Sequence, residues 1–372
     1  MALVIGLMSG TSMDGVDAVL AALGEDEPFK VLTHRHLEMP AALRERLMAL
    51  NESGPDELHQ AALAANGMAA LYADAVDTLL AAAGVDRHDV SAVGAHGQTV
   101  RHRPGEFDGT GYTLQLLNGA LLAERTGIDV VCGFRSRDVA AGGQGAPLVP
   151  AFHAALWSRP NEARAVLNVG GMANLSLLGA DGGVGGFDCG PGNVLMDLWT
   201  ERHLGRPYDD DGAWAAGGRV DARWLSHLLD EPYFRRSPPK STGRDLFHAD
   251  WLDVKLRSTT GHGLSAQDVQ ATLAELSART AGEALLAHAP RTRCLLVCGG
   301  GALNSHLMRR LAFALPGVDV QSTEASGLPP LQVEASAFAW LAHAFMCRQP
   351  GNRPEVTGAR GLRVLGALHP AG

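Results

Sequence analysis

Two apolar segments of strand length, joined by a short turn of small and polar residues, open this chain, and the same arrangement returns near its middle. Residues 2–8 and 16–23 form the first pair, around the turn Ser9-Gly-Thr-Ser-Met-Asp-Gly15. Because no helix fits between them, they predict an antiparallel hairpin. Residues 164–178 repeat this layout around Asn168-Val-Gly-Gly-Met-Ala-Asn174. A duplicated unit that begins with a hairpin predicts an α/β fold built from two related halves.

Helix and strand patterns alternate after each hairpin. The expected helices are 40–51, 57–83, 115–126, 148–157, a helix from 194, 265–288 and 334–347, and the further strands are 29–36, 92–96, 129–132 and 293–297. Ser265, with Asp268 three residues later, is expected to cap its helix.

A chain of 372 residues exceeds one core of ordinary size, so two domains are expected. The glycine-rich stretch Ala140-Ala-Gly-Gly-Gln-Gly-Ala-Pro147 is the expected hinge. We therefore expect one domain over residues 1–140 plus roughly 350–372, and a second over 141–349.

Composition narrows the class of protein. The net charge is −9, and Lys and Arg form no block, so a nucleic-acid partner is not expected. No apolar run reaches about 18 residues, so no membrane span is expected. The eight apolar residues at the start lack a basic flank and read as a buried strand rather than a signal peptide. The five cysteines show neither metal nor disulfide spacing, which indicates a reducing compartment, the cytoplasm.

The first turn has the residue types of a phosphate site. Small residues let backbone N–H groups approach phosphate oxygens, and a carboxylate beside them can hold Mg²⁺ through water. The candidate ATP ligands here are Gly10, Thr11, Ser12, Met13, Asp14, Gly15, Val16 and Asp17, with Asp14 and Asp17 as candidates for the metal. A plain hairpin turn favours the same residues. Neither a Walker-A lysine pattern nor a G-x-G-x-x-G motif is present.

Two further glycine-rich segments fit a nucleotide. The second turn could face the first across a cleft and bracket a triphosphate. A later cluster lies between a strand and a helix, where bare glycines would let an adenosine lie against the backbone. The candidate ATP ligands in these segments are Asn168, Gly170, Gly171, Gly299, Gly300, Gly301 and Asn304.

Asp188 is the candidate general base. It lies in Gly186-Phe-Asp-Cys-Gly-Pro-Gly-Asn193, before a turn that leads into a helix. A carboxylate in this place could point into a cleft between the domains and accept a proton. The competing interpretation is an ordinary aspartate that caps the helix.

Polar donors gather at two other places. The candidate substrate ligands are His96, Gln98, Thr99, Arg135, Gln144 and Asn193. Arginine pairs carboxylates and phosphates well, although Arg101 and Arg103 fit a solvated basic face nearly as well. His34 and His36 alternate in a strand with no third ligand nearby, and they read as exposed strand residues.

At this point the chain resembles the 1,6-anhydro-N-acetylmuramic acid kinase family over nearly its whole length. Several motifs carry the resemblance in a single order: Gly6-Leu-Met-Ser-Gly-Thr-Ser-Met-Asp-Gly-Val-Asp17, Ala95-His-Gly-Gln-Thr99, Phe134-Arg through Ala140-Ala-Gly-Gly-Gln-Gly-Ala-Pro-Leu-Val-Pro150, Asn168–Asn174, Phe187–Asn193, Ser241-Thr-Gly-Arg244, Cys298-Gly-Gly-Gly-Ala-Leu-Asn304, Val356-Thr-Gly-Ala-Arg360 and Leu365-Gly-Ala367.

The resemblance implies a two-domain actin/hexokinase-like (ribonuclease H-like) fold with duplicated mixed β-sheet units and a cleft between the domains. It implies ATP-dependent opening of the anhydrosugar, with phosphorylation of O6, in peptidoglycan recycling. Asp188 falls on the family's catalytic aspartate and Gly10–Asp17 on its ATP-binding segment. A homodimer is also implied. Arg101, Arg135 and Arg137 are candidates for the lactyl carboxylate of the sugar.

One position departs from the family pattern. The family usually has an aspartate immediately before Phe134-Arg135, and this chain has Gly133. That aspartate either supports the sugar or metal site or merely caps a loop. Two alternatives therefore stay open, namely a kinase for another anhydrosugar such as levoglucosan and an ATP-binding protein whose catalytic site has decayed.

Overall fold

The computed structural model describes all of the chain except residues 11–12, 25–28, 244–245 and 259–260. It divides into two compact units: Met1–Leu156 together with Gln332–Gly372, and Trp157–Leu331. The second unit is thus one continuous stretch, and the first is completed by the C-terminal 41 residues, 332–372. The sequence-based expectation placed the first boundary at 140 rather than 156, and the second near 350 rather than at 332.

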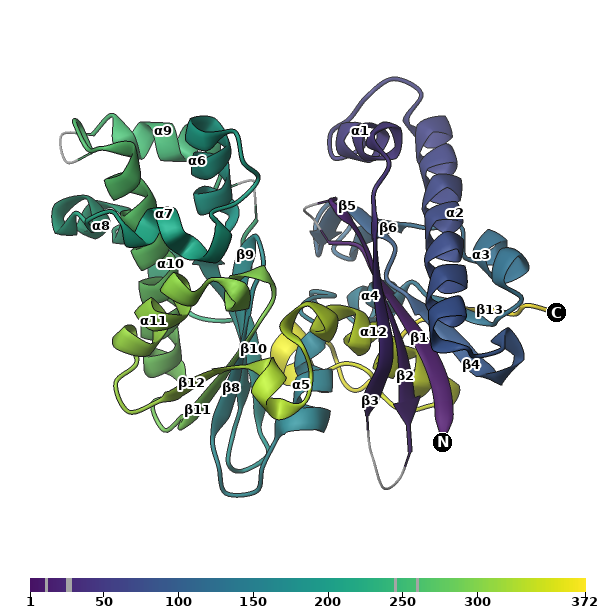
Figure 1. Ribbon diagram of the computed structural model, residues 1–372. Coiled ribbons are helices and arrows are strands. Elements are labelled where there is room, and N and C mark those ends of the chain that lie inside the picture. The colour runs from purple at the N-terminus through teal and green to yellow at the C-terminus, as the bar shows by residue number, and fades with distance from the viewer. Residues whose placement is uncertain (11–12, 25–28, 244–245, 259–260) are drawn as a thin grey trace. The chain divides into compact units, whose positions relative to one another are not determined.

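The first unit is built on a six-stranded mixed sheet with the order β13-β7-β4-β1-β2-β3 (Figure 1). Its strands are β1 (Ala2–Met8), β2 (Gly15–Leu23), β3 (Lys30–Glu38), β4 (Val90–Ala95), β7 (Val130–Cys132) and β13 (Ala367–His369). The expected opening hairpin is present, since β1 pairs antiparallel with β2 from Ala2–Leu23 to Met8–Asp17. Next to it, β4 runs parallel to β1.

Helices cover both faces of this sheet. The helices of the unit are α1 (Ala41–Ala49), α2 (Glu57–Ala83), α3 (Gly119–Thr126), α4 (Phe134–Ala140), α5 (Val149–Trp157), α12 (Val333–Met346) and α13 (Pro354–Thr357). Alternate residues of β1 divide between two cores: Ile5 and Leu7 lie in the cluster with α2, and Val4 lies in the cluster with α12. This period of two is what a strand buried on both faces requires.

A pair of glycines lets α12 lie directly on the sheet. Gly6 of β1 and Gly94 of β4 are neighbours in the parallel register. A Cβ on Gly6 would overlap the carbonyl oxygen of Ala335, and one on Gly94 would overlap that of Phe338. These two positions therefore lack side chains because the helix backbone occupies the space.

The second unit repeats the sheet of the first. Its order is β10-β9-β8-β11-β12. The strands are β8 (Arg164–Val169), β9 (Met172–Leu178), β10 (Val184–Pro191), β11 (Cys294–Cys298) and β12 (Asp319–Ser322). In each sheet the neighbours among the first three strands run antiparallel, and the fourth and fifth strands run parallel to the first. The order across both sheets is therefore third, second, first, fourth, fifth, and β13 adds a sixth strand in the first unit. The expected duplicated mixed sheets are confirmed.

One face of this sheet packs on α10, the central helix of the unit. The helices here are α6 (Val194–Leu204), α7 (Ala213–Ala216), α8 (Ala222–Leu229), α9 (Ala249–Leu256), α10 (Ala266–His288) and α11 (Ser305–Ala314). The predicted cap of α10 is confirmed, since the Ser265 side chain accepts a hydrogen bond from Asp268 N. Among the residues described, no helix has the length and apolar character needed to cross a membrane.

The sequence-based prediction missed a second hairpin in the first unit. β5 (Gln98–Pro104) pairs antiparallel with β6 (Gly111–Leu116), where only polar donors and a basic face at Arg101 and Arg103 were expected. The helix predicted over 115–126 was also too long at its start, because residues 115 and 116 belong to β6 and the helix begins at Gly119. Asn118 caps that helix through Leu121 N.

Candidate functional site

The side chain of Gln98 holds the start of the first turn through two hydrogen bonds. The Ser9 hydroxyl donates to Gln98 Oε1 at 2.5 Å, and Gln98 Nε2 donates to the carbonyl of Gly10 at 3.1 Å. Gln98 is fully buried, so these bonds occupy a side chain that was expected to bind substrate. It fixes the backbone that would meet phosphate. Thr11 and Ser12 lie outside the described residues.

Asp17 contacts both histidines that the sequence suggested were exposed. Its Oδ1 lies 2.9 Å from His34 Nε2 and 3.1 Å from His36 Nδ1. The register explains this contact, because β2 and β3 place Asp17 directly opposite His36 and His34 follows on the same face. The two imidazoles thus hold the carboxylate that follows the first turn.

The residues at this turn fit Mg²⁺ in one particular way. No set of three or more His, Cys, Asp or Glu side chains that could hold a metal occurs in the described part of the chain. Mg²⁺ commonly keeps several waters and binds one or two carboxylates plus substrate phosphates. Asp14, inside a turn rich in small residues, and Asp17, just after it in β2, suit that type of site rather than a cage of protein ligands.

His96 and Arg135 form the polar centre of the first unit. Arg135 Nε and Nη2 lie 3.1 and 3.0 Å from His96 Nε2, and Nη1 donates to the carbonyl of Gly145 at 2.9 Å. Burial, with the guanidinium beside it, lowers the pKa of His96 to about 3. Its neutral ring therefore accepts from Arg135. Burial also lowers the pKa of Arg135, to about 10, which leaves it a cation at neutral pH.

The missed hairpin contributes a row of neutral donors and acceptors. Gln115 Nε2 donates to Thr113 Oγ1 at 2.8 Å and to Thr99 Oγ1 at 3.2 Å. His102 Nδ1 lies 2.9 Å from Thr113 Oγ1. Burial, then the charge of Arg135, lowers the pKa of His102 to about 4, so it too is neutral. The alternation of Thr113 and Gln115 with apolar residues was the signal that could have revealed this strand and its polar side chains.

A fully buried carboxylate fixes the glycine-rich loop that carries Gln144. Asp138 Oδ2 accepts from Gly145 N, and Oδ1 accepts from Asn352 Nδ2 and Thr357 Oγ1, each at 2.8 Å. Gln144 N donates to the carbonyl of Thr357 at 2.7 Å. The motif near the C-terminus therefore acts as a clamp on this loop, a role that the sequence alone did not reveal.

Gly133 and two arginines have clear local settings. Gly133 has φ 68° and ψ 31° just before α4, and a Cβ there would meet nothing within 4 Å. The left-handed region suits glycine and tolerates Asp, so the aspartate usual in the family would fit here without a clash. Arg101 is tied to Glu57 at 2.5 Å and to the carbonyl of Leu50 at 3.3 Å, whereas Arg137 is exposed.

In the second unit the two glycine-rich segments meet. A Cβ on Gly299 would lie 2.5 Å from Asn168 Oδ1, and one on Gly300 would lie 3.6 Å from Asn193 Nδ2. Asn168 Oδ1 is buried and has no hydrogen-bond partner among the described residues. An unsatisfied buried acceptor beside bare backbone is the arrangement that a bound nucleotide could complete. This region therefore suits part of a nucleotide such as ATP.

Two other predicted ligands are engaged in local structure. Asn304 caps α11, where its Oδ1 accepts from Leu307 N at 2.9 Å. Asn193 Nδ2 donates to the carbonyl of Val169 at 3.0 Å, and its backbone N–H donates to the carbonyl of Gly170. Both side chains thus shape the glycine segments, and their contact with a ligand stays a prediction.

Replacing Gly299 with alanine should weaken ATP binding by at least about tenfold. Its φ of 76° costs an alanine about 1–2 kcal/mol, and the new Cβ would lie 2.5 Å from Asn168 Oδ1 and 2.7 Å from the carbonyl oxygen of Val169. Titration calorimetry with an ATP analogue measures the effect. Gly182→Ala is the control, because it also has positive φ (85°) but open space around the Cβ. An equal loss in both variants would contradict a specific role for Gly299.

Asp188 lies in strand β10 and is not the helix cap, a position that Asn193 occupies. Its Oδ2 accepts from Thr242 N at 3.0 Å, and its carbonyl accepts from the Tyr233 hydroxyl at 2.7 Å. Burial raises the pKa of Asp188 to about 6, although the Thr242 bond and the charge of Lys240 work the other way. A carboxylate that is a stronger base than usual yet ionised at neutral pH suits general base catalysis.

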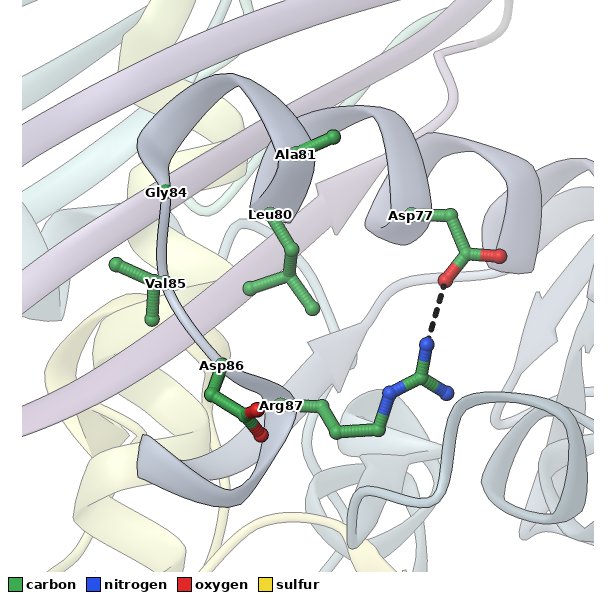
Figure 2. A pocket seen from close by; sticks show the side chains of 7 residues that line it. All are labelled: Asp77, Leu80, Ala81, Gly84, Val85, Asp86 and Arg87. Carbon is green, nitrogen blue, oxygen red and sulfur yellow. Dashed lines mark hydrogen bonds and ion pairs between the residues drawn. The ribbon is translucent and has the colours of Figure 1, made fainter.

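Figure 2 shows a pocket at the C-terminal end of α2 that includes none of these residues. Arg87 spans it, with Nη2 3.5 Å from Asp77 Oδ1 and Nη1 3.0 Å from the carbonyl of Thr126. Leu80, Ala81 and Val85 complete the wall with Gly84 and Asp86. This is a surface hollow that an exposed ion pair closes, and it lies apart from the candidate residues described above.

Comparison with known proteins bears on the whole chain. The profile of a family described as "Anhydro-N-acetylmuramic acid kinase" matches residues 2–371. Curated proteins of the same description are similar at 58% identity in Cupriavidus pinatubonensis, over 98% of both chains, and at 60% in Bordetella petrii, over 99% of this chain and 96% of the relative.

Solved structures show a more distant likeness. The activator of the 2-hydroxyisocaproyl-CoA dehydratase from Clostridium difficile with bound ADPNP is 12% identical, with 93% of this chain and 97% of that chain covered, at a TM-score of 0.49. The ROK hexokinase from Thermus thermophilus is 16% identical, with 92% and 99% covered, at a TM-score of 0.36.

Proposed function

The chain belongs to the anhydro-N-acetylmuramic acid kinase family, and we propose that it opens 1,6-anhydro-N-acetylmuramic acid with water and phosphorylates O6 with ATP. The products are N-acetylmuramic acid 6-phosphate and ADP. The process served is the recycling of peptidoglycan fragments, in the cytoplasm. The observation that carries the proposal is Asp188, a partly buried carboxylate with a raised pKa whose carboxyl group is anchored to backbone.

Asp188 acts as the general base. It takes a proton from water as the water oxygen bonds to the anomeric carbon, and the bond from that carbon to O6 breaks. O6 carries the released electron pair to the γ-phosphorus of ATP, where the bond to the β-phosphate oxygen breaks and ADP leaves. This coupling removes the need for a separate acid to protonate O6.

The sugar is bound by the polar residues of the first unit. Thr99 and the neutral His96 offer hydrogen bonds to hydroxyl and acetamido groups, and Arg135 supplies a cation for the lactyl carboxylate. Gln144 is presented by the loop that Asp138 fixes. Arg101, held by Glu57, is less suited to the carboxylate than Arg135.

Each unit has glycine-rich backbone segments that suit phosphate or nucleotide. The first turn, braced by Gln98, provides N–H groups for phosphate, while Asn168 and Gly299–Gly301 provide the surface for the rest of the nucleotide. Mg²⁺ would be held near Asp14 and Asp17, and when bound it neutralises charge on the transferring phosphoryl group.

The pH dependence of the reaction should report the ionisation of Asp188. Its raised pKa of about 6 means that the base is charged above this pH and neutral below it. We expect kcat/KM for the sugar to be level near pH 7.5 and to fall by about tenfold per unit below pH 6. A coupled ADP-release assay from pH 4.5 to 8.5 measures this. A level profile down to pH 5 would contradict the assignment.

A coupled ADP-release assay with 1,6-anhydro-N-acetylmuramic acid and Mg-ATP tests the proposed function itself. Levoglucosan, which lacks the acetamido and lactyl groups, is the comparison substrate. Preference for levoglucosan would favour the other anhydrosugar kinase, and ATP binding without ADP release on any anhydrosugar would favour a decayed site. Size-exclusion chromatography with light scattering tests the homodimer.

A further inference from the structure

The register of three adjacent strands places Asn168, Asn174 and Asp188 in one row. Asn168 of β8 pairs directly with Asn174 of β9, and Asn174 pairs directly with Asp188 of β10. Residues directly opposite in antiparallel strands project from the same face, with Cβ atoms about 4.5–5.5 Å apart. The next row, Leu167, Leu175 and Phe187, lies in the core on the other face.

Asp188 lies in the edge strand of the sheet, and the loop with Lys240 and Thr242 holds it from the open side. Asp188 N donates to the carbonyl of Lys240 at 3.2 Å, and Thr242 N donates to Oδ2 at 3.0 Å. A β-bulge follows immediately, between Asp188 and Gly190. Such bulges redirect side chains and are common beside active sites. On the sheet side, the neighbour of Asp188 across the strands is Asn174.

The other neighbour of Asn174 belongs to the nucleotide segment. Asn168 Oδ1 is buried without a partner among the described residues, and Gly299 leaves the space beside it open. A carboxamide both donates and accepts hydrogen bonds and does not titrate. Asn174 is therefore the group that stands between the base and the nucleotide segment.

We propose that Asn174 is a positioning residue for the hydrolytic step, one whose carboxamide orients the Asp188 carboxylate toward the attacking water. This inference rests on the proposed function. Thr242 N donates to Oδ2, and the carboxamide of Asn174, directly opposite on β9, is placed to donate to the carboxylate from the sheet side, so that the remaining lone pairs face the water. Because the carboxamide is neutral, it orients the base without changing its charge.

Variants of Asn174 separate orientation from charge. The titratable and charged groups around Asp188 are Lys240, Tyr233 and Cys189, with Arg236 next to Tyr233. Asn174→Asp adds a carboxylate directly opposite Asp188 at nearly unchanged volume. A second negative charge so close disfavours ionisation, so the pKa at which the second of the two carboxyl groups ionises is raised. Asn174→Ala removes the carboxamide that is proposed to hold Asp188 and adds no charge.

The experiment measures kcat, KM for ATP and the pH profile of the full chain. We expect Asn174→Ala to lower kcat by about 10- to 100-fold, with KM for ATP and the calorimetric affinity for an ATP analogue within about twofold of wild type. Asn174→Asp should move the acid limb of kcat/KM upward by about one pH unit. Ser176→Ala is the control, one same-face position along β9, and should stay within about twofold in kcat.

Each other outcome overturns a stated claim. Unchanged kcat in Asn174→Ala, or an acid limb that does not move in Asn174→Asp, overturns the positioning role. An equal loss in Ser176→Ala assigns the effect to packing of the strand and overturns it as well. Thermal denaturation checks folding, and the isosteric aspartate decides the question if the alanine variant unfolds. A wild-type chain without turnover refutes the proposed function, and this inference with it.

Discussion

Asp188→Asn should lower turnover of the anhydrosugar by about 10²- to 10⁴-fold, the usual contribution of a general base. The amide has nearly the same shape, and its oxygen can still accept from Thr242 N, so the local fold should persist. It cannot take a proton from water at neutral pH. The coupled ADP-release assay gives the rate, and calorimetry with an ATP analogue should show affinity within about twofold of wild type.

The matched control is Asp181→Asn, in the turn between β9 and β10. The Asp181 carboxylate is exposed and accepts only a local bond from Gly183 N at 3.1 Å among the described residues. Turnover in this variant should stay near wild type. Full turnover in Asp188→Asn would assign the base to another group, whereas joint loss of turnover and nucleotide affinity would indicate a structural defect.

Gly6→Ala should destabilise the first unit by at least about 3 kcal/mol, the upper end of the usual cost of overpacking. The added Cβ would overlap the carbonyl oxygen of Ala335 and lie 2.6 Å from Ala339 N. Both atoms belong to the backbone of α12, so a side-chain rotation cannot relieve the clash. Urea denaturation, followed by a probe specific to the first unit, measures the loss.

Gly185→Ala is the control for this prediction. It is also a strand glycine, and its Cβ would meet Leu177 at an ordinary contact distance of 3.5 Å. We expect a change within about 0.5–1 kcal/mol there, since replacing an unstrained glycine has only a small effect. If Gly6→Ala is no less stable than this control, α12 can lift from the sheet more easily than its packing indicates.

The duplicated hairpins could be predicted because their signal is local. Each is an apolar alternation broken by a turn of small residues, and nothing distant is needed to form it. Asp188 was named as a candidate base and stays a prediction, whereas its location in a strand was not predicted, because the glycines on both sides of it resemble a turn before a helix. The hairpin of β5 and β6 was missed because Arg101, His102 and Arg103 hide the alternation of β5, and the end of β6 was assigned to a helix.

The contacts that define the candidate site join residues far apart in sequence. From the sequence, Gln98 was expected to be a substrate ligand beside a glycine. In the structure it is buried against Ser9, which lies 89 positions away. Asp138 likewise meets Asn352 and Thr357 more than 200 positions later. Such pairings depend on tertiary packing and leave no periodic trace in the sequence.

The placement of α12 affects how the chain can fold as it is made. β1 and β4, with the Gly6–Gly94 pair, leave the ribosome early, but the helix that covers them begins at Val333. At about 5–20 residues per second, that apolar face stays bare for tens of seconds while residues 157–331, one continuous unit, are synthesised. The nascent chain thus exposes an apolar strand surface that chaperones can bind. The later unit can also fold before the earlier one is complete.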